Sequence, residues 1–412
     1  MKLRYFNFEK DFDKIYKIWQ EIGWIKDNEK QNEALQYFVK GGQGKVALLK
    51  DQVEGYVNST PGHIQYLDEE LSLQAVTAVT ISRIARKQGI ASKATAEVVA
   101  EAAAQGVNVS ALGMFEQGFY NKLGYGTGSY EHIISFDPDH LIIENNYRIP
   151  ERIKLEDFKD VHKSRLERFK RHGYCTLLPT EITHSEMLFG SSKPFGLGYR
   201  DKDGNITHHM WIKPENDLRG PYLIRWMIFN NKEQFFELMN LLKALGDQVH
   251  LVRILEPAGI QFQQFIEKPY HDSHVTKNSK FEVTNKAKAF WQARILNLED
   301  CINKTTFPNN KLEFNLQLKD PIENYLDDNS PWQGLSGEYT LSFGRTSKIK
   351  KGLTPGLLVL KTNINTFTRM WLGAVRPAIL PYTNYFKAPK ELIQKLDNLF
   401  ITLPKPNIDW DF

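Results

Sequence analysis

The feature that most constrains the fold is a strand-like run, VTAVTIS at residues 76–82, closely followed by the basic stretch RKQG and an alanine-rich segment at residues 90–105. Alanine, glutamate and lysine give the last segment a strong helix propensity. Gly106 follows it and is typical of a helix C-terminus. A strand, a glycine-containing loop and a helix in this order predict an α/β unit whose helix begins at the loop.

The loop before this helix has the features of an anion-binding site. The N–H groups of a first helical turn point toward the preceding loop, and the helix dipole favours negative charge there. Gly89 would allow close backbone approach, and Arg86 and Lys87 would supply countercharge. Neither GxxxxGK[ST] nor GxGxxG is present. On its own, the pattern Arg-x-x-Gly-x-Ala therefore predicts either a phosphate-binding loop or a basic turn.

Composition narrows the class of protein. With 412 residues, 41% hydrophobic and 25% charged, the chain is long enough for two to three globular domains. A net charge of +4 without long like-charged blocks argues against nucleic acid or a membrane surface as partner. The two cysteines, Cys175 and Cys301, have no metal-binding spacing, and we expect no metal. With neither a signal peptide nor a membrane-spanning run in the sequence, we expect a cytoplasmic protein.

Apolar periodicity predicts the order of elements along the chain. The expected helices cover residues 11–22, 32–40, 90–105, 116–122, 155–172, 233–245, 364–373 and 389–400. Three strand-like runs between residues 45 and 82 predict an antiparallel meander. The strand-like SYEHIISF is expected to close the first unit near Pro138. A second unit then repeats the rhythm of helix, strand and helix.

A second motif makes the interpretation of the glycine loop more specific. About thirty residues after the loop comes GFYNKLGYG, in which Tyr120 on a short helix precedes a glycine stop and another strand. This order of elements resembles the GNAT acyl-CoA N-acetyltransferases: a strand, the motif R-x-x-G-x-A, a helix, a second strand and then FYxKLGY. The segments AVTAVTIS–RKQGIA, FYNKLGYG, FWQARILNLED and LVLKTNINTFTRMWLGAVRPAIL are similar, more narrowly, to the enhanced-intracellular-survival (Eis) acetyltransferases. The resemblance covers nearly the whole chain.

The resemblance implies a mixed α/β chain of three parts. Residues 1–140 would form a catalytic GNAT domain that binds acetyl-CoA. Residues 141–285 would form a central GNAT-like domain without a cofactor loop, and no second R-x-x-G-x-A occurs between residues 150 and 285. Residues 286–412 would form a domain similar to sterol carrier proteins. The implied activity is N-acetylation of primary amines in polyamine-like, aminoglycoside-like or lysine-bearing acceptors, by a homo-oligomer that is a hexamer in the family.

The resemblance also implies roles for individual residues. The strand carrying Val79 and Ile81 would pair through its backbone with the pantetheine arm of acetyl-CoA. The pyrophosphate would lie on the loop formed by Arg86, Lys87, Gly89, Ile90 and Ala91. Tyr120 would be the general acid that protonates the leaving thiolate. Trp24 and Asp27 lie where the family places groups that bind the acceptor.

The last letters, NIDWDF, carry a further expectation. Ile408, Trp410 and Phe412 alternate with Asp409 and Asp411, as in a short strand with one apolar and one acidic face. The resemblance implies that the α-carboxylate of a C-terminal phenylalanine, here Phe412, is the general base. Because amine acceptors of this class are cationic, we also expect Asp409 and Asp411 to line the acceptor pocket.

A different class of function stays open at this point. The C-terminal unit resembles sterol carriers, so the chain could bind a lipid or another apolar ligand, with a vestigial GNAT part. A fold does not by itself carry a function. The presence of Arg86, Gly89 and Tyr120 favours the enzyme.

Overall fold

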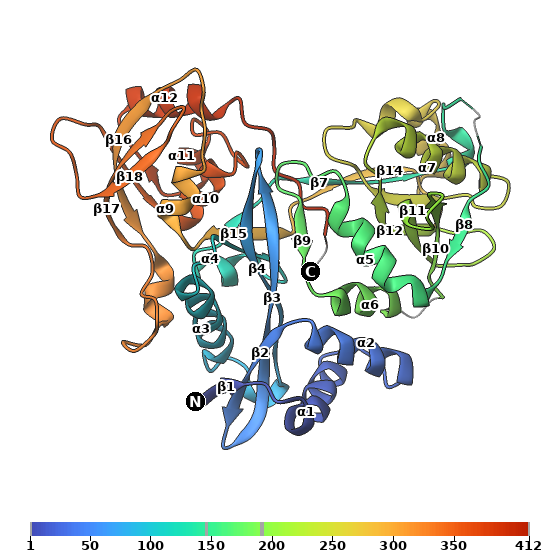
Figure 1. Cartoon of the computed structure of the whole chain (residues 1–412), viewed down its shortest axis with the longest axis horizontal. Helices are drawn as coiled ribbons and strands as arrows, with labels where there is room; N and C mark the ends of the chain where they lie inside the picture. Colours follow the sequence, from blue (N-terminus) through green and yellow to red (C-terminus); the bar gives the residue numbers. More distant parts are fainter. Residues whose placement is uncertain (1, 145–146, 190–192, 411–412) are drawn as a thin grey trace.

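The structure, a computed structural model, describes residues 2–144, 147–189 and 193–410. Within these ranges the strands form three sheets of eight, seven and five strands, each accompanied by helices (Figure 1). The mixed α/β class expected from the sequence is confirmed. No helix in the described ranges has both the length and the apolar composition needed to cross a bilayer.

The first sheet carries the glycine loop. Its strand order is β1-β2-β3-β4-β5-β15-β6, and β9 pairs with β3. The strands are β1 (Lys2–Tyr5), β2 (Gln43–Leu49), β3 (Gln52–Tyr66), β4 (Glu69–Ile81), β5 (Val109–Gly113), β6 (Gly126–Thr127), β9 (Cys175–Leu177) and β15 (Trp291–Ile295). Its helices are α1 (Phe8–Glu21), α2 (Glu29–Lys40), α3 (Ile90–Ala104) and α4 (Gln117–Asn121). The antiparallel meander predicted from the sequence is β2-β3-β4.

The second sheet has the order β14-β7-β13-β12-β11-β10-β8. Its strands are β7 (Glu131–Phe136), β8 (Glu151–Ile153), β10 (Phe195–Arg200), β11 (Ile206–Pro214), β12 (Tyr222–Ile228), β13 (Val252–Leu255) and β14 (Thr284–Lys288). The helices of this part are α5 (Phe158–Glu167), α6 (Thr180–Leu188), α7 (Lys232–Ala244) and α8 (Pro269–Thr276). One pair, β12 with β13, is parallel and is paired over only two residues of each strand.

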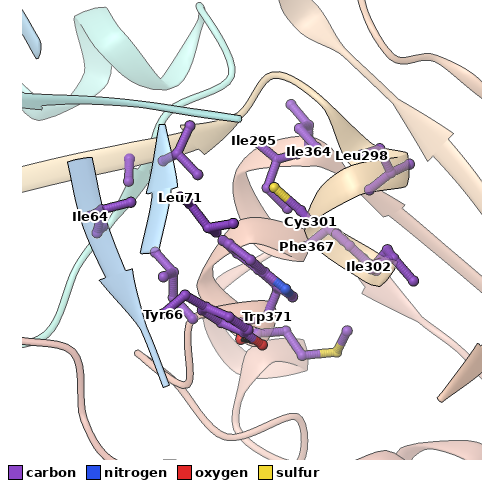
Figure 2. Packing of buried hydrophobic residues seen from close by; sticks show 14 of the residues in the cluster. Ile64, Tyr66, Leu71, Ile295, Leu298, Cys301, Ile302, Ile364, Phe367 and Trp371 are labelled. Atoms are coloured by element: carbon purple, nitrogen blue, oxygen red, sulfur yellow. Dashed lines mark hydrogen bonds between the residues drawn. The ribbon is translucent and has the colours of Figure 1, made fainter. Parts of the chain in front are cut away.

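The third sheet has the order β18-β17-β16-β19-β20. Its strands are β16 (Leu312–Lys319), β17 (Gly337–Phe343), β18 (Lys348–Lys351), β19 (Val359–Asn363) and β20 (Phe386–Lys387). Its helices are α9 (Leu298–Asn303), α10 (Ile364–Trp371), α11 (Leu380–Thr383) and α12 (Lys390–Phe400). One apolar cluster continues from this part into the first sheet, where Tyr66 stacks on Trp371 with ring centroids 4.2 Å apart (Figure 2). The two parts therefore share a core.

Two strands are exchanged between the first and second sheets. The sequence placed residues 131–136 at the end of the first unit, but β7 pairs with β13 and β14 in the second sheet (Figure 1). In return β15, which follows the second sheet in the chain, inserts between β5 and β6 of the first. The assignment of β7 to the first unit is wrong because nothing local in a strand specifies its partner. The domain bounds at residues 140 and 285 stay predictions.

The last described residues leave the C-terminal part and lie against the other two. Ser129 donates a hydrogen bond to the carbonyl of Pro406, and the Asn407 N–H donates to the carbonyl of His172, 3.1 Å away. Ile408 and Trp410 are buried, as their alternation with Asp409 predicted. The described part of this segment, however, belongs to no sheet, so the expectation of a strand is wrong for it. Side-chain contacts hold the segment instead.

Candidate active site

A cleft opens where β4 and β5 separate. The two strands pair in parallel over residues 73–75 and 109–111 and then diverge. Beyond that point residues 76–81 of β4 face a cleft of about 1350 Å³, whose lining also includes residues 113–116 from the end of β5. Since backbone N–H and C=O groups require partners, the separated strand edges can hydrogen-bond an extended ligand.

A bulge in β4 gives this strand its shape beside the cleft. The pairing with β3 shifts between Tyr56 and Asn58, where residues 78 and 79 of β4 lie opposite the single residue Val57, so β4 has one extra residue. Ala78 has φ of 52°, in the left-handed region that non-glycine residues rarely adopt. A bulge bends its strand and increases the local twist. The bulge follows within a few residues of Ala75, the last residue of β4 that pairs with β5. No feature of the sequence had indicated it.

The predicted phosphate loop lies at one end of the cleft. Arg86, Lys87 and Gly89 are exposed and line it, followed by Ile90 and Ala91 at the start of α3. Gly89 is the N-cap of α3 with φ of 75°, and a Cβ atom there would meet nothing within 4 Å. The glycine is thus required by backbone conformation and leaves open space above the loop. The first-turn N–H groups of α3 have no intrahelical acceptors. The loop can hold a phosphate group.

Val79 and Ile81 lie where the sequence predicted them. Both are half-buried, and both line the cleft on the β4 side. Ile81 pairs with Gly55 on the β3 side, which leaves the other edge of β4 toward the cleft.

Tyr120 reaches the cleft from α4. Glu116 caps this short helix by accepting a hydrogen bond from the Gly118 N–H, 2.9 Å away. The ring of Tyr120 is 7% exposed and packs edge-on against Phe119, with centroids 4.8 Å apart. Within the described ranges its hydroxyl has no hydrogen-bond partner. Burial raises the pKa of Tyr120 to about 12, so the hydroxyl keeps its proton at neutral pH and can donate it.

The residues predicted to bind the acceptor are not all brought together. Trp24 lines the cleft and is 47% exposed. Asp27 is exposed, lies outside the lining and accepts a hydrogen bond from Tyr16, 3.0 Å away. Asp409 forms an ion pair with Arg168 in the central part and does not line this cleft either. Asp411 and Phe412 lie outside the described residues.

Further aromatic residues line the cleft, and the sequence analysis had not predicted Trp19, Phe38 or Phe290 there. Trp19 in α1 and Phe38 in α2 line the cleft, with ring centroids 5.5 Å apart, and Trp19 meets Trp24 edge-on at 5.1 Å. Phe290 contributes to the lining from just before β15. The two tryptophans flank the end of α1 in the sequence WQEIGW, a signal that could have been read. Phe290 has no such signal because it is placed by the exchanged strand β15, which begins at the next residue.

The central part has a corresponding notch that is nearly filled. β12 and β13 pair in parallel through Tyr222 and Leu223 and then separate, as β4 and β5 do. The cavity between them is only about 70 Å³, and residues 407–409 belong to its lining. The chain's own segment therefore lies where the first sheet has an open cleft.

Comparisons with known proteins agree with this geometry. Residues 2–128 match the family model described as acetyltransferase (GNAT) domain. Comparison with curated proteins finds no significant match. Among solved structures, a probable N-acyltransferase from Enterococcus faecalis has a TM-score of 0.80 at 17% identity, over 100% of this chain and 99% of that one. A GCN5-related N-acetyltransferase from Anabaena variabilis has a TM-score of 0.78 at 17% identity, with both chains fully covered.

Cleft, loop and family model together identify a GNAT acetyltransferase domain in the N-terminal part of the chain. The fold of the whole chain is Eis-like. Eis1 from Mycobacterium abscessus superposes with a TM-score of 0.75 at 14% identity, over 100% of each chain.

Proposed function

We propose that the enzyme transfers an acetyl group from acetyl-CoA to a primary amine within the β4–β5 cleft. The observation that carries the proposal is the meeting of three groups at one cleft: the exposed basic loop at Gly89, the unpaired edge of β4, and the protonated Tyr120.

The residues present fit the charge and shape of acetyl-CoA. Its pyrophosphate is anionic, and Arg86 and Lys87 place two cations beside a helix N-terminus. Its pantetheine arm is an extended chain with amide groups, for which the edge of β4 at Val79 and Ile81 offers backbone partners. Acetyl-CoA supplies the acetyl group as an activated thioester.

The chain's own residues then handle protons and orientation. A C–N bond forms to the amine while the C–S bond breaks, so one proton leaves the nitrogen and one reaches the sulfur. Tyr120 can give its proton to a thiolate within the cleft, because its raised pKa keeps it protonated. The general base predicted from the sequence, the α-carboxylate of Phe412, stays a prediction. Its support is that the segment before it is anchored as far as Trp410, whose indole N–H donates to Glu186 at 2.9 Å.

The other features that the family resemblance implies are also proposals. The filled notch at β12 and β13 supports a central part that binds no acetyl-CoA. For the sterol-carrier-like part we favour a structural role over lipid binding: a cavity there, beside Trp332 and Tyr339, is about 270 Å³, against about 1350 Å³ at the GNAT cleft. Assembly into a homo-oligomer, expected as a hexamer, can be checked by light scattering.

The direct test is release of free thiol from acetyl-CoA in the presence of a panel of primary amines, including polyamines, an aminoglycoside and a lysine peptide. Amine-dependent release, with acetyl-CoA binding seen by calorimetry, is the expected result. Tight binding of a fatty ligand without any amine-dependent release would instead favour the carrier function.

A further inference from the structure

The aromatic end of the cleft carries little negative charge for a site that receives cationic amines. Helices α1 and α2 and the residues between them contribute Trp19, Ile22, Trp24 and Phe38, and only one carboxylate, Glu21. Trp24 leaves nearly half of its surface in water, where an apolar partner could cover it. This end of the cleft therefore offers a surface for an apolar group.

The charges of all the described lining residues also favour an apolar acceptor. Among the described residues that line the cleft, two are carboxylates, Glu21 and Glu116. Four are cations: Arg83, Arg86, Lys87 and Lys122. Even if acetyl-CoA neutralises the loop cations Arg86 and Lys87, two cations remain against two carboxylates. Among the described residues, which do not include Asp411 and Phe412, a ligand with several ammonium groups would find no excess of negative charge here.

The two carboxylates also have partners of their own. Glu21 accepts the backbone N–H of Arg83 at 2.5 Å, and the Arg83 guanidinium donates to the Glu21 carbonyl at 2.5 Å. Glu116 accepts the Gly118 N–H as the cap of α4. Each carboxylate can accept further hydrogen bonds, but both already have a structural role. A single ammonium can be accommodated at Glu21 or on an aromatic face.

An apolar surrounding also helps the chemistry. The nitrogen must lose its proton before it can attack, and desolvation of an ammonium lowers its pKa. Aromatic walls around the amine, with Arg83 nearby, favour the neutral nucleophile without requiring several acidic groups.

We infer that the acceptor is a primary monoamine with an apolar body, and that Trp19, Trp24 and Phe38 bind that body. The inference rests on the proposed acetyl transfer and narrows its acceptor class. It differs from the polyamine-like and aminoglycoside-like acceptors that the family resemblance implies, because those carry several charges and few apolar atoms.

The test compares two amines of equal length, hexylamine and 1,5-diaminopentane, which differ in a methyl group against a second ammonium at the far end. We expect kcat/KM for hexylamine to exceed that for the diamine at least about tenfold, after correction for the diamine's two equivalent amines. Equal values, or a preference for the diamine, would overturn the inference while leaving acetyl transfer in place.

Variants separate acceptor binding from other effects. Trp24→Ala should raise KM for hexylamine about tenfold, leave KM for acetyl-CoA within about twofold, and change the diamine's kinetics little. Trp24→Phe should restore most of the loss. Tyr270→Ala, at a 75% exposed aromatic of α8 outside the lining, is the matched control and should change nothing. An equal effect of Trp24→Ala on both amines would contradict an apolar acceptor site.

Acetyl-CoA binding distinguishes the two possible failures. If calorimetry shows acetyl-CoA binding but neither amine releases thiol, the apolar monoamine is excluded and the cofactor site stands. If acetyl-CoA does not bind at all, acetyl transfer and the acceptor class fail together.

Discussion

Arg168 and Asp409 form a doubly hydrogen-bonded ion pair between residues 241 positions apart: Nε donates to Oδ2 at 2.6 Å and Nη2 donates to Oδ1 at 2.8 Å. The Asp409 carboxylate also accepts the backbone N–H of Cys175, 3.1 Å away. The side chains are 4% and 18% exposed, so the pair is largely shielded from water. This contact fixes the segment after α12 to the central part and uses an aspartate that the sequence had assigned to the acceptor.

Removing the carboxylate should destabilise the protein strongly. Asp409→Ala leaves the buried Arg168 guanidinium without its counter-ion, and we expect the free energy of unfolding to fall by about 3 kcal/mol in urea titrations. The exposed pair of Lys395 and Glu391 supplies the control, because Glu391→Ala should cost less than about 1 kcal/mol. Equal losses in the two variants would show that the buried pair does not anchor the segment.

The two ends of α3 offer a matched test of the phosphate loop. Gly89 and Gly106 have φ of 75° and 82°, and a Cβ at either position would meet nothing within 4 Å. Glutamate should therefore strain both sites similarly, by about 1–2 kcal/mol. Only Gly89→Glu places a negative charge beside the loop, so only this variant should weaken acetyl-CoA binding, at least about tenfold by calorimetry. Equal affinities for the two variants would reject the loop assignment.

Tyr120→Phe should lower kcat about 100-fold, the range typical of a lost general acid. In the parent enzyme the acid stays protonated below its pKa of about 12. Between pH 7 and 10 the rate should therefore rise as the amine loses its proton and should show no falling limb. Tyr130→Phe, at an exposed tyrosine outside the cleft lining, is the control. A falling limb near pH 9 that disappears in Tyr120→Phe would mean that this tyrosine titrates far below the expected value.

His209 should make stability depend on pH. The Trp226 indole N–H donates to its Nε2 at 3.1 Å, so this nitrogen must be unprotonated, and burial lowers the pKa of His209 to about 3. In the unfolded chain histidine titrates near 6.5. Between these values the unfolded state binds the extra proton, and the free energy of unfolding falls as pH decreases, by at most about 1.4 kcal/mol per pH unit for one proton.

Urea titrations at pH 7.5, 6.0 and 5.0 can measure this effect. His209→Gln keeps an acceptor for Trp226 and removes the titration, so the loss of stability toward pH 5 should be smaller. His271→Gln, at a side chain that is 70% exposed, should leave the pH dependence unchanged. An identical slope in His209→Gln and the parent protein would contradict a buried, neutral His209.

The predicted GNAT domain, residues 1–140, should not fold alone. A chain of residues 1–140 lacks β15, whose five residues are all buried between β5 and β6. It also retains β7, whose partners lie in the second sheet. We expect this fragment to bind no acetyl-CoA and to be recovered in folded form only when co-expressed with residues 141–412. A monomeric fragment that unfolds cooperatively and binds acetyl-CoA would disprove this.

Local features were predictable from the sequence and non-local ones were not. Helix α3 was placed to within one residue because its alanines, Gly89 and Gly106 act over a few positions. Helix α6 was missed, since TEITHSEML contains weak helix formers and is held by packing on α2 and α5. The expected helix to residue 172 ends at Glu167, because Arg168 leaves it to bind Asp409.

In the candidate site, too, residues that belong to a local motif were predicted, and residues placed by non-local contacts were not. The loop residues and Tyr120 carry a motif and were found, and the structure brings them to one cleft. Asp27 and Asp409 were assigned from position alone, and each has another partner. The bulge at Ala78 depends on the register between β3 and β4, and the place of Phe290 depends on the pairing of β15 with the distant β5. No short stretch of the sequence encodes either one.

The exchange of β7 and β15 sets an order of events during synthesis. On the ribosome, the first sheet emerges with a gap between β5 and β6 that only residues 291–295 can fill. The second sheet already needs β7, made before any of its other strands. Neither sheet can close before nearly three hundred residues have been translated, so the nascent chain cannot present a finished acetyltransferase cleft early. The same dependence would hinder loss or transfer of either half as a separate gene segment.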